Sequence, residues 1–423
     1  MKPVHALSLD QINLSDIDFW TRPLAEREGA FATLRAENPL PFFPEPVIDI
    51  PGIVAGRGYH AVTKFDDILE VSKNPQLYCS GFGAPSIQDT GAEFNEFFGS
   101  MINMDDPRHA RLRKIVASGF TPRMLKKVED DVQRAAQEIV DDLLKTGGGD
   151  FVTDVAARLP LKVICDMMGI PEADYETVFK CSNVILGAGD SEYVDQTDPN
   201  QIIHSILQAG GDLHGMVTEL GKYRREHPTD DLTSALVNAE VDGERLTDQE
   251  LGSFFILLVV AGNETTRNAI SHGLHLLTQN PEQRAILAAD FDAVSATAVE
   301  EIVRVASPVI FMRRTATADA VLRGRAINQG DKLVMFYWSA NRDEAVFPDP
   351  YRFDVRRTPN PHVGFGGPGP HFCLGAHLAR REITVMFREL FARVPNIATT
   401  GEPERLRSMF INGIKHLDCE IAA

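Results

Sequence analysis

The sequence predicts a mainly α-helical chain with a smaller β part. Residues 107–147 have a helical pattern, and a capping box at 247–250 opens a second long helix. Residues 308–340 instead mix turns with strand-like apolar runs, such as the run at 332–338. We therefore expect long helices with one smaller region of strands.

The remaining elements follow in chain order. Residues 1–60 are punctuated by prolines, and the apolar alternation from Ile48 to Val54 predicts a strand. The helical pattern after residue 107 is broken at Thr121-Pro122. Gly147-Gly148-Gly149 predicts a loop, and further helical segments continue to about Glu226.

The helix that begins at Thr247 is long enough to cross a whole domain. Thr247 and Glu250 form its capping box, and Pro281 stops it after about 33 residues, or ~50 Å at 1.5 Å per residue. Its centre, from Phe254 to Gly262, is apolar on every face. A helix that is apolar all round is expected to be buried.

Length and composition favour one soluble domain over residues 1–423. The chain has no low-complexity linker and no repeat, and its longest apolar run, Phe254 to Ala261, is too short to span a bilayer. No basic-plus-apolar leader is visible at the N-terminus. The five cysteines are scattered and odd in number, as in a reducing compartment, so we expect a cytoplasmic protein.

The net charge of −18, from 42 basic and 60 acidic side chains, argues against nucleic acid or an anionic membrane as a partner. One stretch has the opposite charge. Between Asp106 and Glu129 there are basic residues and no acid: Arg108, Arg111, Arg113, Lys114, Arg123, Lys126 and Lys127. This stretch is either a solvated helix face or a docking patch for an acidic protein.

The most informative cysteine is Cys373, at the end of the glycine-rich stretch 364–375 and before a predicted helix. A helix N-terminus and nearby amide N–H groups favour its thiolate. No second ligand stands at zinc spacing, so one soft metal ion with one protein ligand, such as haem iron, is the leading candidate. The other cysteines are expected to be inert packing residues: Cys79, Cys165, Cys181 and Cys419.

The same stretch has two other interpretations. Gly364, Gly366 and Gly369 match the spacing of a dinucleotide-binding fingerprint, but prolines precede the match where that fingerprint needs a strand. A nucleophilic cysteine is also conceivable, although the sequence identifies no partner histidine.

A second candidate site interrupts the apolar centre of the long helix. Burying the carboxylate of Glu264 is costly unless it is hydrogen-bonded or takes part in chemistry. Thr265 can bond back to the carbonyl of Ala261, and Gly262 leaves room for a flat cofactor or O2. The structural alternative is a polar seam that pairs with a neighbouring helix.

The stretch around Cys373 resembles the haem-binding loop of the cytochrome P-450 family. The glycine four residues before the cysteine, the basic residue two before it and the glycine two after it all match; Phe365 stands eight residues before it, whereas the family usually has seven. Four further stretches are similar to family motifs and occur in family order: Asp105 to Arg113, Ala261 to Thr266, Glu301 to Arg304 and Phe347 to Asp354.

The resemblance implies the cytochrome P-450 fold, with the long helix over a haem b, and it assigns residue roles. Cys373 would be the axial metal ligand, and Glu264 and Thr265 would relay protons. Other cofactor-binding residues would be His109, Arg113, Ala261, Gly262, Arg314, Phe365, His371 and Gly375.

Of these, His109, Arg113, Arg314 and His371 would bind the propionates, with Arg313 as an alternative to Arg314. Glu301 and Arg304, which could be a surface ion pair by spacing alone, would form a buried structural pair completed by Arg352 or Arg357.

Within the family, the sequence resembles mycobacterial omega-hydroxylases of methyl-branched lipids and sterol side chains. A hydrophobic lipid would therefore be hydroxylated at or near its terminus with O2, beside apolar residues in family positions: Ile185, Leu186, Val260, Val309, Phe311 and Ile411. Because the chain contains no flavin or ferredoxin segment, electrons would come from a ferredoxin and a ferredoxin reductase. A peroxygenase and a non-enzymatic haem or lipid sensor remain the alternatives.

Overall fold

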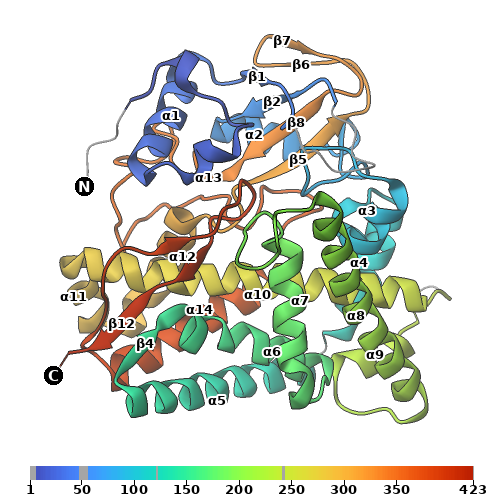
Figure 1. Cartoon of the computed structure of the whole chain (residues 1–423), viewed down its shortest axis with the longest axis vertical. Coiled ribbons are helices and arrows are strands. Elements are labelled where there is room, and N and C mark those ends of the chain that lie inside the picture. Colours follow the sequence, from blue (N-terminus) through green and yellow to red (C-terminus); the bar gives the residue numbers. More distant parts are fainter. Residues whose placement is uncertain (1–5, 47–55, 121, 241–242, 423) are drawn as a thin grey trace. The chain divides into compact units, whose positions relative to one another are not determined.

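The computed structural model describes residues 6–46, 56–120, 122–240 and 243–422. It is mostly helical with a smaller β part, as predicted (Figure 1). The strand predicted from Ile48 to Val54 lies outside the described residues. Within the described ranges, no helix combines the length and apolar character needed to cross a membrane.

The chain forms two compact units, each assembled from three stretches of sequence. Unit 1 comprises Met1–Ala92, Gln279–Ala376 and Arg405–Gly413. Unit 2 comprises Glu93–Thr278, His377–Glu404 and Ile414–Ala423. The single domain over residues 1–423 stays a prediction.

The helices of unit 1 are α1 (Leu24–Glu37), α2 (Phe65–Lys73), α11 (Pro281–Ala289), α12 (Phe291–Ala306) and α13 (Tyr337–Ala340). Its strands are β1 (Phe42–Phe43), β2 (Tyr59–Val62), β3 (Tyr78–Cys79), β5 (Phe311–Ala316), β6 (Ala320–Leu322), β7 (Arg325–Ile327) and β8 (Lys332–Phe336). Short helical turns lie at Leu9–Gln11 and Ile17–Thr21.

One terminal residue of each of α3, α10 and α14 belongs to unit 1. Otherwise, the helices of unit 2 are α3 (Ala92–Gly99), α4 (Arg108–Gly119), α5 (Pro122–Thr146), α6 (Arg158–Met168), α7 (Tyr175–Leu186), α8 (Pro199–Glu226), α9 (Leu232–Asn238), α10 (Asp248–Gln279) and α14 (Ala376–Arg393). Its strands are β4 (Gly148–Asp150), β9 (Ile397–Thr399), β11 (Ile414–His416) and β12 (Asp418–Ile421), and β10 (Glu404–Arg405) lies at a unit boundary in sequence. Short helical turns lie at Ser100–Asn103, Val152–Ala156 and Glu172–Asp174.

A five-stranded sheet in the order β1-β2-β8-β5-β3 organises unit 1. Strand β8 pairs parallel with β2 and antiparallel with β5, and all its residues are buried. Val334 and Phe336 point into an aromatic cluster, whereas Leu333 and Met335 point into a second cluster on the opposite face. The sequence from 333 to 336 is continuously apolar because both faces of this strand are covered.

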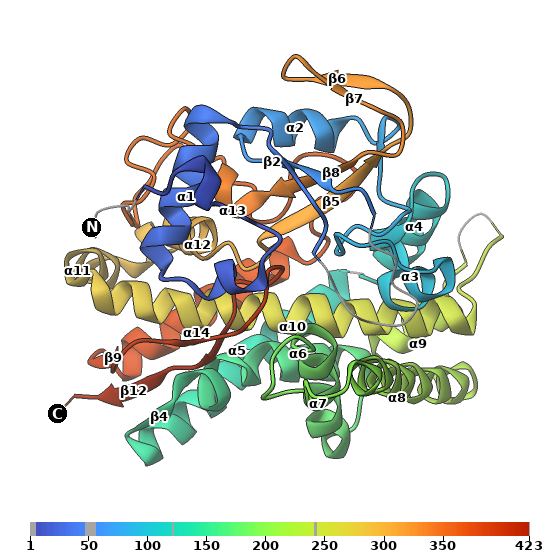
Figure 2. The same ribbon diagram turned by 45° about the horizontal axis from the view of Figure 1, so that its top comes forward.

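Helix α10 is the longest helix among the described residues and matches its predicted bounds closely (Figure 2). The capping box is present: Glu250 N–H donates to the Thr247 hydroxyl at 3.1 Å, and Thr247 N–H donates to the Glu250 carboxylate at 3.0 Å. The helix ends at Gln279, and α11 begins at Pro281. Local sequence signals therefore set both ends of this helix.

The break predicted near Thr121-Pro122 is present, since α4 ends at Gly119 and α5 begins at Pro122, although Thr121 lies outside the described residues. The loop predicted at 147–149 is wrong in part, because Gly148 and Gly149 belong to β4 and pair with β12. Gly148 has a φ of 154°, and a Cβ there would lie 2.5 Å from the Cys419 carbonyl oxygen. Glycine is needed here because another backbone passes so close.

Candidate active site

The loop before α14 folds back on itself and presents the Cys373 thiol. The backbone N–H of Cys373 donates to the Phe365 carbonyl at 3.0 Å, and Gly366 N–H donates to the Val363 carbonyl at 2.9 Å. Gly366 has a φ of 87°, in the left-handed region that favours glycine. The glycines therefore permit a compact turn whose last residues, Cys373 to Gly375, lead directly into the helix.

The thiol of Cys373 is exposed, whereas the other four cysteines are buried, and no disulfide joins any of these five described residues. Burial raises the pKa of the Cys181 and Cys419 thiols to about 11 and that of Cys165 to about 12. A thiol must ionise to bind a metal or to attack a substrate. The chemistry of a thiolate is therefore concentrated at Cys373.

The surroundings of Cys373 fit a flat apolar group that carries a soft metal ion. Its neighbours Phe372 and Leu374 are 40% and 38% exposed, which is unusual for large apolar side chains. A Cβ built on Gly375 would meet no atom within 4 Å. The loop thus offers an accessible sulfur ligand, apolar contact surface and open space on one short segment.

The two adjacent arginines of β5 have different roles. Arg313 is 1% exposed and donates to the carbonyls of Phe82, Ile87 and Gln88, and to the Asp89 carboxylate. Its guanidinium is therefore used to hold the segment after β3. Arg314 points to the other face of the strand and donates to the Arg313 carbonyl at 2.7 Å.

His371 and Phe365, the other predicted cofactor residues of unit 1, lie on the cysteine loop. The Nε2 atom of His371 is 3.1 Å from the Ser80 hydroxyl, and the Phe365 ring is centred 6.0 Å from the His362 ring.

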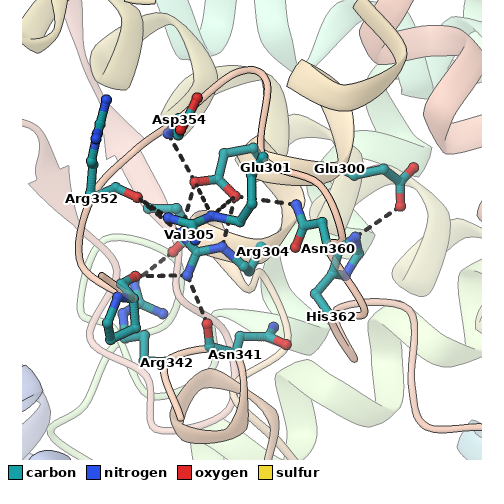
Figure 3. Close-up of polar contacts among 12 residues, drawn as sticks. Glu300, Glu301, Arg304, Val305, Asn341, Arg342, Arg352, Asp354, Asn360 and His362 are labelled. Atoms are coloured by element: carbon teal, nitrogen blue, oxygen red, sulfur yellow. Dashed lines mark hydrogen bonds and ion pairs between the residues drawn. The ribbon is translucent and has the colours of Figure 1, made fainter. Parts of the chain in front are cut away.

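Glu301 and Arg304 form a fully buried ion pair on α12, as the resemblance implied and as spacing alone could not decide (Figure 3). Two hydrogen bonds of 2.7 and 2.8 Å join the guanidinium to the carboxylate. Arg304 also donates to the carbonyls of Asn341 and Pro350, and Asn360 donates to Glu301. The carboxylate and the guanidinium therefore both have several hydrogen-bond partners, as a buried ion pair requires.

The third member of this network is Arg357. Its Nε donates to both oxygens of Glu301 at 3.1 Å, whereas Arg352 contributes only its backbone carbonyl to Arg304 and Arg357. The choice between the two arginines, left open by the sequence, is settled by these contacts.

In unit 2, α4 presents His109 and Arg113 one turn apart on one helix face. His109 is 3% exposed, and burial lowers the pKa of its imidazole. The acid-free stretch is partly neutralised by acids from elsewhere in unit 2: Arg108 pairs with Glu96, and Arg111 pairs with Glu244 and Glu250.

The centre of α10 is not buried on every face, which corrects the sequence prediction. Ala261 is exposed and Leu257, Gly262 and Thr265 are half-buried, whereas Phe254 to Ile256 are buried. Residues 257, 261 and 265 share one helix face, so a stripe of small and apolar side chains is open there. The spacing of apolar residues in a sequence cannot distinguish a helix face that packs against protein from a helix face that contacts a ligand.

Thr265 lies in this stripe, and the buried Glu264 directly precedes it. The Thr265 hydroxyl donates to the Ala261 carbonyl at 2.8 Å, as predicted. Glu264 is 1% exposed and is ion-paired with Arg267 on the next turn. Sequence reasoning missed Arg267, although its position three residues after a buried acid was the available signal.

These features agree with what comparison with known proteins finds. A cytochrome P450 family model matches residues 54–394. The chain belongs to the cytochrome P450 family. It is a monooxygenase and hence an oxidoreductase, as predicted. Members of this family hold a haem whose iron is bound by a cysteine thiolate, and the residues around Cys373 fit that group.

Three relatives illustrate the similarity of this P450 to known proteins. It is 50% identical over 418 residues to the methyl-branched lipid omega-hydroxylase of Mycobacterium tuberculosis, covering 98% of this chain and 96% of the relative. It is 41% identical to the steroid C26-monooxygenase of Mycolicibacterium smegmatis, covering 95% and 93%. A solved Mycobacterium marinum cytochrome P450 in complex with pseudoionone is 45% identical, with a TM-score of 0.91 and coverage of 98% and 99%.

The residues predicted to contact substrate lie in both units of this P450. In unit 2, Ile185 and Leu186 end α7 and Val260 lies on α10, and all three are half-buried. In unit 1, Val309 forms an isolated bridge with Ile411. Phe311 is 1% exposed and belongs to the aromatic cluster beneath the sheet.

Glu382 of α14 was not predicted from the sequence to be a functional residue. It is 2% exposed, and its Oε2 has no hydrogen-bond partner among the described residues. Burial raises the pKa of its carboxyl to about 8, so this side chain is largely protonated at neutral pH.

His416 joins two segments that are distant in sequence. Its Nδ1 lies 2.6 Å from the Asp150 carboxylate on β4, and its Nε2 lies 3.0 Å from the Glu192 carboxylate between α7 and α8. Neighbouring Lys415 pairs with Glu192 at 2.7 Å and with Glu404 at 3.0 Å. Because both ring nitrogens face carboxylates, the doubly protonated imidazolium suits this position.

This arrangement predicts a pH-dependent contribution to stability. The hydrogen bond to Asp150 raises the pKa of His416, so the stabilisation is complete below the unfolded pKa, about 6.5, and is lost as pH rises through the folded pKa. Burial opposes ionisation of Asp150, but hydrogen bonds from His416 and from the backbone of Leu417 and Val152 lower the pKa of its carboxyl, so its contribution is lost only in acid.

In thermal unfolding from pH 5.5 to 8.5, His416→Gln should therefore destabilise most at the acid end, by up to about 1 kcal/mol because the pair is partly exposed. The same substitution at exposed His204 of α8 is the control. A difference between His416→Gln and wild type that is constant with pH would contradict the assignment.

Proposed function

We propose that this P450 hydroxylates a methyl-branched or isoprenoid lipid, or a sterol side chain, at or near its terminus. The observation that carries the reaction class is the exposed Cys373 thiol, framed by glycine turns at the start of α14. The substrate class rests on the 50% and 41% identical relatives, whose names specify a methyl-branched lipid and a steroid.

Haem b is the proposed cofactor, and Cys373 would supply the protein ligand to its iron. When bound, the haem would supply redox chemistry for the activation of O2, with electron density from the thiolate. His109 and Arg113 of unit 2, and Arg314 and His371 of unit 1, are the proposed partners of the propionates. Arg313 is left out because its donors are already used within unit 1.

Glu264 and Thr265 are the proposed proton carriers. The carboxylate can take up a proton, and the Thr265 hydroxyl can both accept and donate one. Because Thr265 bonds back to Ala261, its hydroxyl is held at the open stripe of α10. The small side chain of Ala261 keeps that stripe accessible to O2.

The substrate assignment predicts a preference for long branched chains. Each buried CH2 contributes about 0.8 kcal/mol, so affinity should grow with chain length. Attack at the terminus requires that the protein positions that end, since internal C–H bonds are intrinsically weaker. Branched fatty acids and terpenoids should shift the haem spectrum from low to high spin and yield terminal alcohols. Turnover of small polar aromatics with no response to branched lipids would contradict this.

A ferredoxin is the proposed electron donor, and the start of α5 is part of its docking surface. Lys126 is 68% exposed, and its one ion pair within the described residues is with Asp130 of its own helix, so it remains available to an acidic partner. Charge reversal in Lys126→Glu should slow electron transfer and weaken its salt dependence, while peroxide-driven turnover stays nearly unchanged.

The matched control is Lys145→Glu at the other end of α5, because Lys145 is 73% exposed and pairs in the same way with Asp142. Equal slowing by the two variants would mean that net charge acts, and not a docking surface.

A further inference from the structure

The two carboxylate oxygens of Glu264 have different surroundings. Oε1 accepts hydrogen bonds from the Arg267 guanidinium and, at 2.9 Å, from the Asn268 amide. Oε2 is buried and has no hydrogen-bond partner among the described residues. A structural ion pair normally satisfies both oxygens, because a buried acceptor without a donor is costly. The Oε2 atom is therefore the one suited to exchange a proton.

Arg267 connects this acid to helix α7. It is 3% exposed, and while its Nη2 donates to Glu264, its Nη1 donates to the Asn183 side-chain oxygen at 2.9 Å. Asn183 is 8% exposed and lies two residues before Ile185. One rigid guanidinium thus links a residue beside the proposed substrate segment to the proposed proton carrier.

A second bond joins the same two helices without touching Glu264. Asn263, one turn before Arg267, donates to the Ser182 hydroxyl at 3.2 Å. These two neighbouring contacts both join α7 to α10, but of the two it is the Asn183 contact that involves Arg267, the partner of Glu264. Substitutions at the two contacts can therefore distinguish an effect on the packing of the helices from an effect on the orientation of Glu264.

Another ionisable side chain near the ion pair does not compete with it. Tyr193, in the segment after α7, packs against Gly187, where a Cβ would lie 2.3 Å from its ring. It is close enough to interact with both charges, and burial raises the pKa of its phenol to about 12. It is therefore neutral over the working pH range.

We propose that Arg267, held by Asn183 of α7, is a positioning residue that orients the Glu264 carboxylate for proton delivery. Its planar fork fixes Oε1 and so leaves Oε2 directed away from the pair. Because Asn183 holds the other side of the fork, the position of α7 determines how firmly Glu264 is held. This inference rests on the proposed role of Glu264 as a proton carrier.

The first test measures product formed per NADPH consumed by the holoenzyme with a ferredoxin and its reductase. Asn183→Ala and Arg267→Met should lower this ratio by roughly tenfold and release peroxide, since misplacing a group by about 1 Å can cost up to ~100-fold. Arg267→Lys keeps the charge but cannot bond both partners, so it should be intermediate. Ser182→Ala should resemble wild type.

The second test is spectroscopic and does not require turnover. The infrared bands of the Glu264 carboxyl group, ionised or protonated, are assigned in the resting holoenzyme by their loss in Glu264→Gln. A buried carboxylate without its cation is costly, so the band of the protonated acid should be stronger at neutral pH in Arg267→Met than in wild type. Should Arg267→Met not fold, Arg267→Lys and Asn183→Ala carry both measurements.

The outcomes separate this inference from the proposed function. If Glu264→Gln leaves the product ratio unchanged, the proton-carrier role itself fails. If Glu264→Gln uncouples the enzyme but Asn183→Ala and Arg267→Lys do not, only the positioning role fails. Equal uncoupling by Ser182→Ala and Asn183→Ala would also overturn it, because the effect would then come from loosening α7.

Discussion

Cys373→Ser is expected to abolish hydroxylation and to remove the spectrum of thiolate-bound haem. A serine hydroxyl is a poorer electron donor than a thiolate and remains largely protonated at neutral pH. The electron donation that favours O–O cleavage is therefore lost. The measurement is the absorption spectrum of the reduced protein with carbon monoxide, together with product formation. In the variant, the band characteristic of thiolate ligation should be replaced by one at shorter wavelength.

Cys419→Ala is the control, because this cysteine is buried on β12 and its thiol pKa is raised by burial. It should keep the thiolate spectrum, with any loss confined to stability. A normal carbon monoxide spectrum in Cys373→Ser would contradict the assignment of the ligand.

The second large effect is expected at the buried network of α12. Glu301→Gln keeps the shape of the side chain but leaves the guanidiniums of Arg304 and Arg357 without their anion, and Arg304 is completely buried. Breaking a buried ion pair in this way costs about 3–5 kcal/mol, a large fraction of the stability of most domains. Denaturant unfolding should record the loss, and the yield of folded protein should drop sharply.

Arg352→Ala provides the matched control within the same loop. The Arg352 side chain is exposed, and only its carbonyl joins the network, so its removal should cost less than about 0.5 kcal/mol. Similar losses in Arg352→Ala and Glu301→Gln would mean that the loop, rather than the ion pair, determines stability.

The sequence predicted those features that depend on local signals. The bounds of α10 followed from the Thr247–Glu250 capping box and from Pro281, and both act within a few residues of the helix ends. The family was recognisable because the residues around Cys373 and four other short stretches each carry their own pattern.

Features that depend on distant contacts could not be predicted in this way. Whether Arg357 or Arg352 contacts Glu301 depends on the path of an irregular loop. Such a loop has no periodic sequence pattern from which its path could be predicted. The bond between Arg267 and Asn183 joins residues from two separate helices. Likewise, Gly148 and Gly149 resembled a loop because their strand partners lie near the other end of the sequence.

That distant pairing has a consequence for how the protein is made. In the sheet β4-β12-β9, β12 is the central strand, so β4 and β9 have no shared partner until residues 418–421 have been synthesised. Because a ribosome adds residues in order, the backbone N–H and C=O groups of β4 that pair with β12 remain unpaired until residues 418–421 have been added. This sheet of unit 2 can therefore close only after residues 418–421 have emerged, and a nascent chain interrupted before Asp418 would be a natural target for chaperones and proteases.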